Sequence, residues 1–389
     1  MREKIAFVVQ RYGLEVNGGS EAYCREVAEH MTAAYDVDVY TTCALNYDTW
    51  ENHYPAGREE LNGVTVYRYP TDRMRDPKVF NPLCGKIFGH PEHDDAAEER
   101  WIDEQGPYAP KALEALAERR GEYRAILYMT YLYWLTARGL PAGYDHSILI
   151  PTLHDEPPVY IRAYDRVFAA AKGLAWLTPE EQEFGQKRFP PVKEKPQVLI
   201  GAGVQEPAGE LPLIPEALRG VSYIVYAGRV DEGKGCHEMF RYYTEYRRRH
   251  ADAPKLVLIG KAVMEIPEDP GIVQLGFVSE EMKYAVMREA RALVLFSRFE
   301  SLSIVLLESM MMGRPVLVSG HSEVLKGHCI RSNAGLYFMN YYEFDRALTW
   351  LLTHPEAYEA MQENGKRYVR EQYRWEGITE RLRRLIESV

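Results

Sequence analysis

Two glutamates in the second half of the chain, Glu300 and Glu308, offer carboxylates at a spacing that suits a long polar ligand. They lie between apolar runs at residues 292–296 and 315–318, in a polar loop and a helical pattern at 303–312. This order predicts a β-α-β unit whose loop lies at a strand's carboxyl end, where parallel sheets bind ligands. At about 1.5 Å per helical residue, the two carboxylates stand up to roughly 12 Å apart, a span that fits a hexose and a ribose joined through a diphosphate. Taken alone, the pair is equally compatible with solvated charges.

A second loop, residues 228–235, combines glycines with basic side chains. It follows a predicted strand and precedes a predicted helix, and its sequence is Gly-Arg-Val-Asp-Glu-Gly-Lys-Gly. The spacing G-x-x-x-x-G-K, which ends at Lys234, matches a phosphate-binding P-loop. Gly235, however, stands where that loop has the hydroxyl that holds magnesium. A P-loop NTPase with this loop would lack its metal ligand. From the residues alone, a phosphate-binding loop, a solvated charge and a true P-loop remain alternatives.

Loops in the first half supply further candidates at predicted strand ends. Gly18 and Gly19 open a helix, and they either let a ligand approach the backbone or form an ordinary turn. His154 follows a strand at residues 146–151, and Asp155 beside it is a candidate to orient the imidazole. Aromatic residues at 130–134 are compatible with both an acceptor platform and ordinary packing.

Two patterns that resemble metal sites are set aside. Asp36 and Asp38 form a D-x-D sequence, but they alternate with valines in a predicted strand and so form one polar face. Residues 71–95, like the loop-rich segment 46–63, are predicted to be irregular and lack the helix or knuckle that fixes ligand geometry. The candidate ligands in the former segment are His90, His93, Asp94 and Asp95. No metal site is therefore expected.

Composition excludes several classes of protein. The 389 residues suffice for two domains, and 46% hydrophobic with 27% charged residues is typical of a globular chain. A net charge of -10 disfavours sequence-independent nucleic-acid binding, and five scattered cysteines indicate neither disulfides nor zinc. No apolar run approaches a membrane span or a signal peptide, so a cytoplasmic location is expected. Peripheral membrane contact is not indicated, and the oligomeric state stays open.

The glutamate pattern resembles a known family. Glu300, seven residues, Glu308 and then Gly-Arg-Pro-Val at 313–316 are similar to the signature of retaining nucleotide-sugar glycosyltransferases of the GT-B fold, family 4 (glycosyl transferases group 1). The resemblance implies that Glu300 binds hydroxyls of the donor sugar and that Glu308 binds the ribose. It also implies that Arg229 and Lys234 hold the donor diphosphate.

The resemblance extends to other positions. It implies that the histidine at 154 contacts the donor sugar and that the first glycine pair lies against the donor's phosphates. Backbone near Phe277 and Val278 would read the base. The catalytic residues implied are Glu300, His154, Arg229 and Lys234. The donor and nucleotide contacts implied are Gly18, Gly19, Arg229, Lys234, Phe277, Val278, Glu300, Ser301, Leu302, Ser303 and Glu308.

Strands alternate with helices in both halves, which predicts two doubly wound α/β domains. The resemblance adds the GT-B arrangement of two facing parallel-sheet, Rossmann-like domains with a C-terminal crossing helix. We expect an acceptor-binding domain at residues 1–200, joined by a crossing helix at about 373–389. A nucleotide-sugar-binding domain is expected at 201–372, after a proline-rich linker region at 190–215.

The sequence thus predicts a retaining glycosyltransferase that moves a sugar from a nucleoside diphosphate to a hydroxyl acceptor without a metal or another cofactor. A UDP-linked hexose is expected from family frequency alone. Two alternatives remain: a GT-B sugar-nucleotide 2-epimerase, and a catalytically silent nucleotide-sugar-binding subunit. A silent subunit is expected to lack Glu300, Lys234 or His154, and this chain retains all three.

Overall fold

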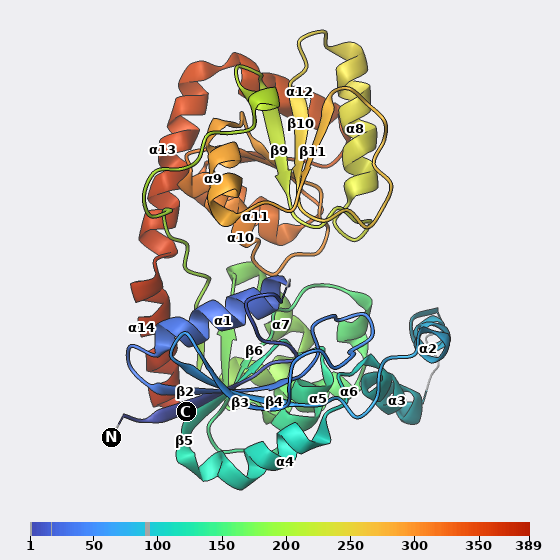
Figure 1. Cartoon of the computed structure of the whole chain (residues 1–389), viewed down its shortest axis with the longest axis vertical. Helices are drawn as coiled ribbons and strands as arrows, with labels where there is room; N and C mark the ends of the chain where they lie inside the picture. The colour runs from blue at the N-terminus through green and yellow to red at the C-terminus, as the bar shows by residue number, and fades with distance from the viewer. Residues whose placement is uncertain (1, 17, 90–93) are drawn as a thin grey trace. The chain divides into compact units, whose positions relative to one another are not determined.

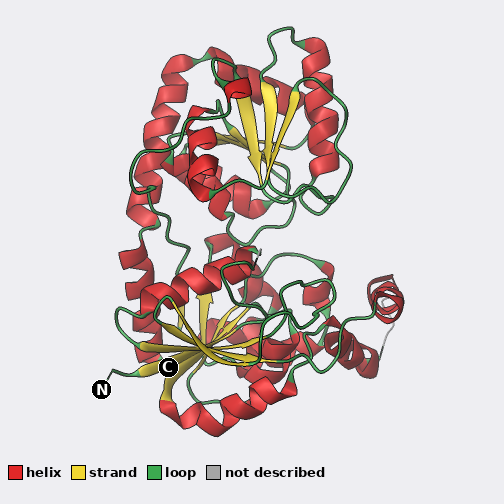
Figure 2. Ribbon diagram, viewed as in Figure 1, coloured by secondary structure: helices red, strands yellow, loops and turns green. Residues whose placement is uncertain are grey.

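The computed structural model describes residues 2–16, 18–89 and 94–389. The chain divides into two compact units (Figure 1). Unit 1 comprises Met1–Gly201 with Glu376–Val389, and unit 2 comprises Ala202–Trp375. Each is an α/β unit built on one sheet, as the alternating pattern predicts, and Figure 2 shows helices on both sides of the strands in each.

The sheet of unit 1 has the strand order β3-β4-β2-β1-β5-β6-β7-β8. All neighbouring strands are parallel except β3 and β4, which form an antiparallel edge. The chain runs outward from β1 in one direction and then outward from β5 in the other, so the topological switch point lies between β1 and β5. The strands are β1 (Lys4–Val8), β2 (Asp36–Thr42), β3 (Gly57–Leu61), β4 (Val64–Tyr69), β5 (Tyr123–Met129), β6 (Ser147–Ile150), β7 (Gly173–Trp176) and β8 (Gln197–Leu199).

The helices of unit 1 pack their apolar sides against this sheet. A large buried cluster joins the sheet to α3, α4, α5 and α6, with Trp101, Leu116 and Phe168 among its members. The helices are α1 (Gly19–Met31), α2 (Pro77–Gly89), α3 (Asp95–Gln105), α4 (Pro110–Arg119), α5 (Trp134–Gly139), α6 (Ala163–Ala170), α7 (Pro179–Arg188) and α14 (Trp375–Ser388).

The last helix, α14, returns the chain to unit 1. Its residues Ile378, Leu382 and Ile386 recur every four positions and are all fully buried, so one apolar face packs against the unit. Arg381 Nη2 donates to the carbonyl of Ile200 at 2.9 Å, and Arg124 Nη1 donates to the carbonyl of Val389 at 3.1 Å. The predicted crossing helix is confirmed.

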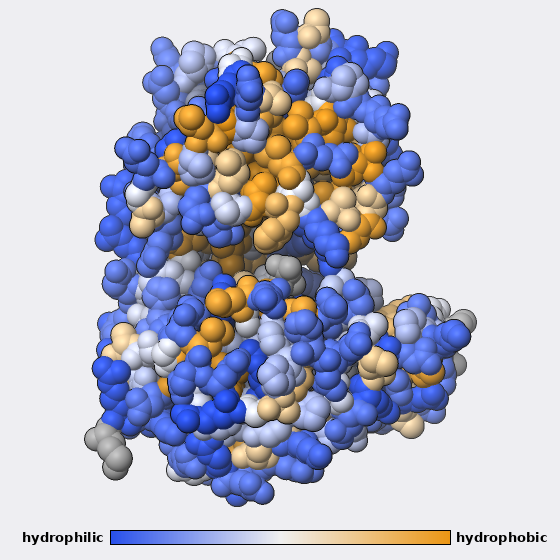
Figure 3. Space-filling view, in the orientation of Figure 1, coloured by the Kyte–Doolittle hydropathy of each residue, from blue (hydrophilic) through white to orange (hydrophobic). Residues whose placement is uncertain are grey.

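Unit 2 has a six-stranded, fully parallel sheet in the order β11-β10-β9-β12-β13-β14. Its switch point lies between β9 and β12, which flank the middle of the sheet. The strands are β9 (Tyr223–Ala227), β10 (Lys255–Ile259), β11 (Ile272–Gly276), β12 (Leu293–Leu295), β13 (Val316–Ser319) and β14 (Gly335–Phe338). The helices are α8 (Cys236–Arg249), α9 (Glu280–Glu289), α10 (Ile304–Met311), α11 (Glu323–Ser332), α12 (Tyr341–Thr353) and α13 (Pro355–Gln372). In the view of Figure 3, hydrophobic residues gather over part of the surface of this unit.

The structure corrects two local expectations in unit 1. The segment 71–95, predicted to be irregular, holds α2: Pro77 stands at its start, where no N–H partner is needed, and Leu83 and Ile87 bury one face. The segment 46–63, predicted to be a loop, contains β3. Farther along the chain, α3 and α4 are separate helices because the chain turns at Gly106, where φ is 66°.

Candidate functional site

Lys234 and Glu300 meet at the switch point of unit 2. Lys234 lies in the loop between β9 and α8, and Glu300 lies in the loop between β12 and α10. Because β9 and β12 are adjacent parallel strands, their following loops share one edge of the sheet. Lys234 Nζ donates to Glu300 Oε1 at 2.7 Å. The structure therefore joins a cation and a carboxylate that are 66 residues apart.

Arg229 and Asp231 form a second ion pair in the β9–α8 loop, through Arg229 Nε and Asp231 Oδ2. The other oxygen of Asp231 accepts a hydrogen bond from the backbone N–H of Lys234 at 2.8 Å. The aspartate thus fixes both predicted diphosphate-binding residues from within one loop. Sequence analysis did not single out Asp231, although its position midway between the two cations was a usable signal.

Gly235 explains why this loop is not a P-loop. Its φ is 72°, and a Cβ built at this position would lie 2.3 Å from the carbonyl oxygen of Phe296. That contact is with backbone and cannot be relieved by moving a flexible side chain. A serine or threonine does not fit here, so the loop has no place for the hydroxyl by which a P-loop holds magnesium.

Glu308 lies on α10 and is only 6% exposed, so it is not a surface charge. Its Oε1 accepts hydrogen bonds from Lys283 Nζ at 2.8 Å and from the hydroxyl of Tyr284 at 3.0 Å. Burial raises the pKa of Glu308, and the positive charge of Lys283 partly offsets this increase. Both partners come from α9, and sequence reasoning missed them because nothing in their type or spacing refers to a residue 25 positions away.

The other donor contacts predicted in unit 2 lie in loops at the same end of its strands. Phe277, which is 78% exposed, and Val278 follow β11 and lead to Ser279, the N-cap of α9. The Ser279 hydroxyl accepts a hydrogen bond from the N–H of Met282 at 3.3 Å. These residues therefore precede the helix that carries both partners of Glu308. Ser301, Leu302 and Ser303 lead into α10; Leu302 is buried, and Ser303 has a left-handed backbone with φ of 70°.

In unit 1, Gly18 caps α1 and Gly19 begins it, above a buried ion pair. Arg11 Nη2 donates to Glu21 Oε1 at 2.6 Å, and both side chains are almost fully buried. A Cβ at Gly18 would lie 2.2 Å from Glu21 Oε2, whereas one at Gly19 would enter open space. A side chain at Gly18 would therefore displace the ends of Glu21 and Arg11, whereas Gly19 has room at this helix start.

His154 lies in the loop after β6, beside Glu156 rather than Asp155. Its Nδ1 is 3.4 Å from Glu156 Oε1, which also accepts a hydrogen bond from the hydroxyl of Tyr131 at 3.0 Å. Asp155 instead accepts from the hydroxyl of Tyr160 at 2.6 Å. The expectation that Asp155 orients the imidazole is therefore wrong. A carboxylate two positions after the histidine was visible in the sequence, but the adjacent aspartate drew the assignment.

Another carboxylate, Glu181, lies beneath this loop. Glu181 is 2% exposed and accepts hydrogen bonds from the backbone N–H groups of Leu153 and Leu177, each at 2.5 Å. Burial raises its pKa to about 8, and the backbone N–H groups directed at it oppose that increase. Sequence analysis missed Glu181 because it read as an ordinary charge in the first turn of a helix.

The aromatic segment 130–134 packs mainly into the core of unit 1. Tyr131 is fully buried and Trp134 is 6% exposed, with the Trp134 indole N–H donating to Asp103 at 3.0 Å. These two rings therefore do not offer open faces to a ligand. The packing alternative is correct for them.

The D-x-D sequence lies in β2, as expected, but its two aspartates differ. Asp36 is exposed, whereas Asp38 is buried and accepts hydrogen bonds from the hydroxyl of Tyr123 at 2.7 Å and from Arg119 at 3.2 Å. The expected common polar face is therefore wrong for Asp38, which is part of an internal network.

A search of residues 2–16, 18–89 and 94–389 finds no group of three or more His, Cys, Asp or Glu side chains placed to hold a metal ion. His90 and His93 lie outside the described residues. Asp94 accepts a hydrogen bond from the N–H of Ala97 at 2.7 Å and so caps α3.

Over the same described part of the chain, no helix combines the length and apolar character that crossing a membrane requires.

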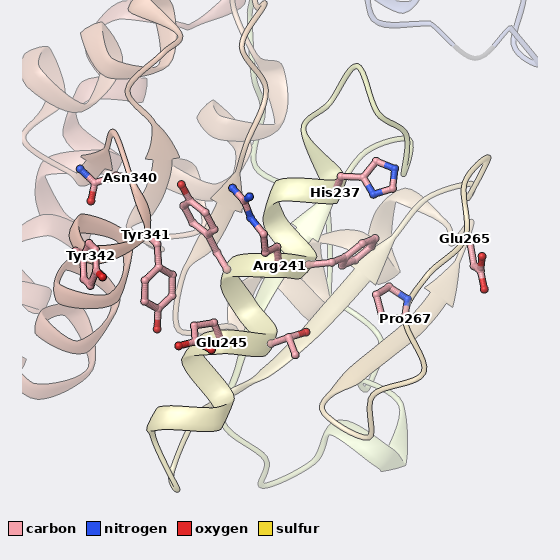
Figure 4. A pocket seen from close by; sticks show the side chains of 11 residues that line it. His237, Arg241, Glu245, Glu265, Pro267, Asn340, Tyr341 and Tyr342 are labelled. Atoms are coloured by element: carbon pink, nitrogen blue, oxygen red, sulfur yellow. The ribbon is translucent and has the colours of Figure 1, made fainter.

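Figure 4 shows a pocket of about 980 Å³ beside α8, bordered by the start of α12 and by the loop after β10. Its lining includes His237, Arg241 and Tyr342, and it contains none of the predicted site residues. Arg241 Nη2 lies 3.4 Å from Glu238 Oε1. Glu245 forms ion pairs with Arg248 and Arg249 of the same helix. The chemistry of the switch-point loops, rather than the volume of this pocket, defines the candidate donor site.

Comparisons with known proteins agree with this location. Residues 221–354 match the family model described as Glycosyl transferases group 1. The Xenopus tropicalis protein "Glycosyltransferase 1 domain-containing protein 1" is 25% identical over 249 residues, which are 55% of this chain and 67% of that protein. Residues 221–354, which match the family model, include Arg229, Lys234, Glu300 and Glu308.

Solved structures extend the similarity to the whole chain. Sucrose-phosphate synthase from Thermosynechococcus elongatus has a TM-score of 0.69 at 17% identity, covering 99% of this chain and 98% of that one. The E. coli structure titled "Trehalose-6-phosphate … bound with UDP-2-fluoro glucose" has a TM-score of 0.71 at 12% identity, covering 100% of both. The Anabaena protein HepE, in complex with UDP and glucose, has a TM-score of 0.66 at 13% identity, covering 100% of both.

The chain has the GT-B fold, which confirms the predicted fold. Residues 221–354 match the model of glycosyl transferases group 1, which supports the predicted group for that segment.

Proposed function

We propose that this protein is a retaining glycosyltransferase that moves a hexose from UDP to a hydroxyl acceptor without a metal ion. The contact between Lys234 and Glu300 at the switch point carries the proposal. It places a cation suited to a diphosphate beside a carboxylate suited to sugar hydroxyls, within the glycosyl transferases group 1 domain. Glu308, on the helix that follows Glu300, is the ribose ligand in this account.

The choice of UDP and of a hexose has separate support. Among the structurally similar proteins, one is titled as bound to UDP-2-fluoro glucose and another as a complex with UDP and glucose. Both are similar to this chain over its whole length. UDP-glucose is therefore the first donor to test.

The reaction breaks the bond between the anomeric carbon of the sugar and the diphosphate oxygen. Lys234 and Arg229 stabilise the negative charge that develops on the departing diphosphate, as fixed charges in a site of low dielectric do. Glu300 holds the sugar hydroxyls, and His154 stabilises the charge that develops on the sugar. The acceptor oxygen attacks the face that the diphosphate leaves and gives its proton to the leaving phosphate, which preserves the anomeric configuration.

The test begins with thermal shifts in UDP, GDP, ADP and dTDP. A nucleotide at 100 times its dissociation constant stabilises the folded protein by about 2.7 kcal/mol, so the preferred base raises Tm most. UDP is expected to give the largest shift, and UDP-glucose is then assayed with a panel of hydroxyl acceptors. The proposal fails if none of the four nucleotides shifts Tm. Conversion of UDP-glucose into an isomeric sugar nucleotide, without any acceptor, would indicate an epimerase instead.

A further inference from the structure

We propose that Glu156 and Glu181 are positioning residues that together fix His154 for sugar transfer, Glu156 through the imidazole ring and Glu181 through the loop backbone. The inference rests on the role of His154 in the proposed function. All the contacts that support it lie within unit 1.

The ring contact involves Glu156, whose Oε1 lies 3.4 Å from His154 Nδ1. The carboxylate is itself held by the hydroxyl of Tyr131, a fully buried residue at the carboxyl end of β5. The backbone N–H of Glu156 donates to the carbonyl of His154 at 2.9 Å, so a tight turn brings the two residues together. At 3.4 Å the contact is an ion pair that does not meet hydrogen-bond geometry. A carboxylate on this side of the ring favours a proton on Nδ1, so Nε2 is the nitrogen assigned to the sugar.

The backbone contact involves Glu181, in the first turn of α7. Thr178 and Glu181 have the spacing of a helix capping box, and the Thr178 hydroxyl accepts from the N–H of Glu181 at 3.2 Å. As in an ordinary capping box, the Glu181 carboxylate accepts from the backbone N–H of the N-cap residue Thr178. In addition, one oxygen accepts from Leu177, just before that helix, and the other accepts from Leu153, 28 residues away in the chain.

Helix capping alone does not explain this arrangement. Burying a carboxylate is costly, and a cap at a solvent-exposed helix end performs the same task without that cost. Glu181 instead links the ends of β6 and β7, directly before His154. The preceding residue, Thr152, has φ of 49°, a conformation that persists in a threonine only where its surroundings impose it. The hydrogen bond to Leu153 supplies such a constraint.

The two carboxylates thus act at different levels. Glu156 sets the tautomer and angle of the ring, and Glu181 sets the position of the chain that carries the ring. Neither residue is assigned a bond to the substrate. Their loss is therefore expected to change kcat more than the KM for the donor, because the charged side chains assigned to the nucleotide, Arg229, Lys234 and Glu308, lie in unit 2.

The test of Glu156 compares Glu156→Gln with Asp155→Asn, its neighbour bound to Tyr160. Glu156→Gln keeps an oxygen for Tyr131 but removes the charge, and we expect kcat to fall about 10- to 100-fold, as is typical when the partner of a functional histidine is replaced. Asp155→Asn is expected to remain within about threefold of wild type. The ring ¹⁵N shifts of His154 should indicate one tautomer in wild type and Asp155→Asn, and a mixture in Glu156→Gln.

The test of Glu181 compares Glu181→Gln with Glu183→Gln, an exposed glutamate on the same helix. Hydrogen exchange at the Leu153 amide should accelerate at least tenfold in Glu181→Gln alone, while the UDP-induced thermal shift is unchanged in both variants. Exchange and ¹⁵N shifts do not require activity, so they test the inference even if wild type transfers no sugar. Unchanged His154 tautomer in Glu156→Gln, or unchanged Leu153 exchange in Glu181→Gln, overturns the corresponding half of the inference.

Discussion

The two units differ in how exposed their charged residues are. In unit 2, Lys234 and Glu300 pair in loops at the edge of the sheet, and the Lys234 side chain is 37% exposed, while Glu308 and Lys283 pair between α10 and α9. In unit 1 the charged residues near the candidate site are buried and directed at scaffold: Arg11 and Glu21 pair beneath Gly18, and Glu181 holds backbone N–H groups.

The difference has a physical reason. A donor carries a diphosphate and several hydroxyls, so its site needs cations and carboxylates whose partners can be exchanged for ligand groups. Until such a ligand binds, Lys234 and Glu300 neutralise each other's charge as an ion pair. A single histidine needs fixed geometry instead, and groups that stay buried and satisfied provide it.

The largest effect is expected for Lys234→Ala. Removing the cation that faces the leaving diphosphate should lower kcat by roughly 10²- to 10³-fold, the usual cost of losing one charge-stabilising donor. Lys261→Ala, an exposed lysine in the loop after β10, is the matched control and should retain wild-type kcat. Steady-state kinetics with UDP-glucose measures both. Equal kcat values in the two variants would show that the switch-point pair plays no part in transfer.

The second prediction separates the two glutamates of unit 2. Glu308→Ala should weaken UDP binding by about 10- to 100-fold, because it removes charged hydrogen bonds to the ribose and leaves Lys283 without its buried partner. Glu300→Ala should leave UDP affinity nearly unchanged and slow transfer. Isothermal titration calorimetry with UDP gives both affinities. Equal UDP affinity in Glu308→Ala and wild type would remove the ribose assignment.

The smallest effect concerns the scaffold of unit 1 and is a pH dependence. Burial raises the pKa of Glu181 from 4.5 to about 8, so between these pH values the folded state holds a proton that the unfolded state has released. Stability then falls as pH rises through that window. The phenol of Tyr23 lies close enough to Glu181 to feel its charge, but its pKa lies well above 10 and it does not titrate there.

Glu181→Gln removes this titration. Between pH 5 and pH 8, its Tm should decrease less than that of wild type, while Glu183→Gln should follow wild type. Differential scanning fluorimetry across the pH series measures the slopes. If all three proteins lose Tm in parallel, Glu181 is ionised throughout and the pKa direction is wrong.

The sequence supported the fold and the strand-end loops of unit 2 because these depend on local patterns. Apolar runs and glycines located β9, β12 and the loops after them, and the resemblance assigned Lys234 and Glu300. Their direct contact was not predictable from either loop alone, because it depends on β9 and β12 being neighbours. The same limit applies to Lys283, which reaches Glu308 only through the packing of α9 beside α10.

In unit 1 the sequence was less informative. Pro82 and Gly85 suggested an irregular segment where α2 forms, since local propensity is overridden by the burial of Leu83 and Ile87. Glu181 resembles any acidic residue in a first helical turn, and only the tertiary position of Leu153 gives it a second function. Long-range backbone contacts of this kind leave no signal in residue type.

The most direct test of the account is sugar transfer from UDP-glucose in excess EDTA, with the anomeric configuration of the product read by NMR. The charges of Arg229 and Lys234 are present without a divalent ion. Transfer in excess EDTA should therefore proceed at the same rate as transfer without EDTA. The α-configured donor should give an α-linked product. Loss of transfer in EDTA with recovery in Mg²⁺ would contradict the metal-free mechanism, and a β-linked product would contradict retention.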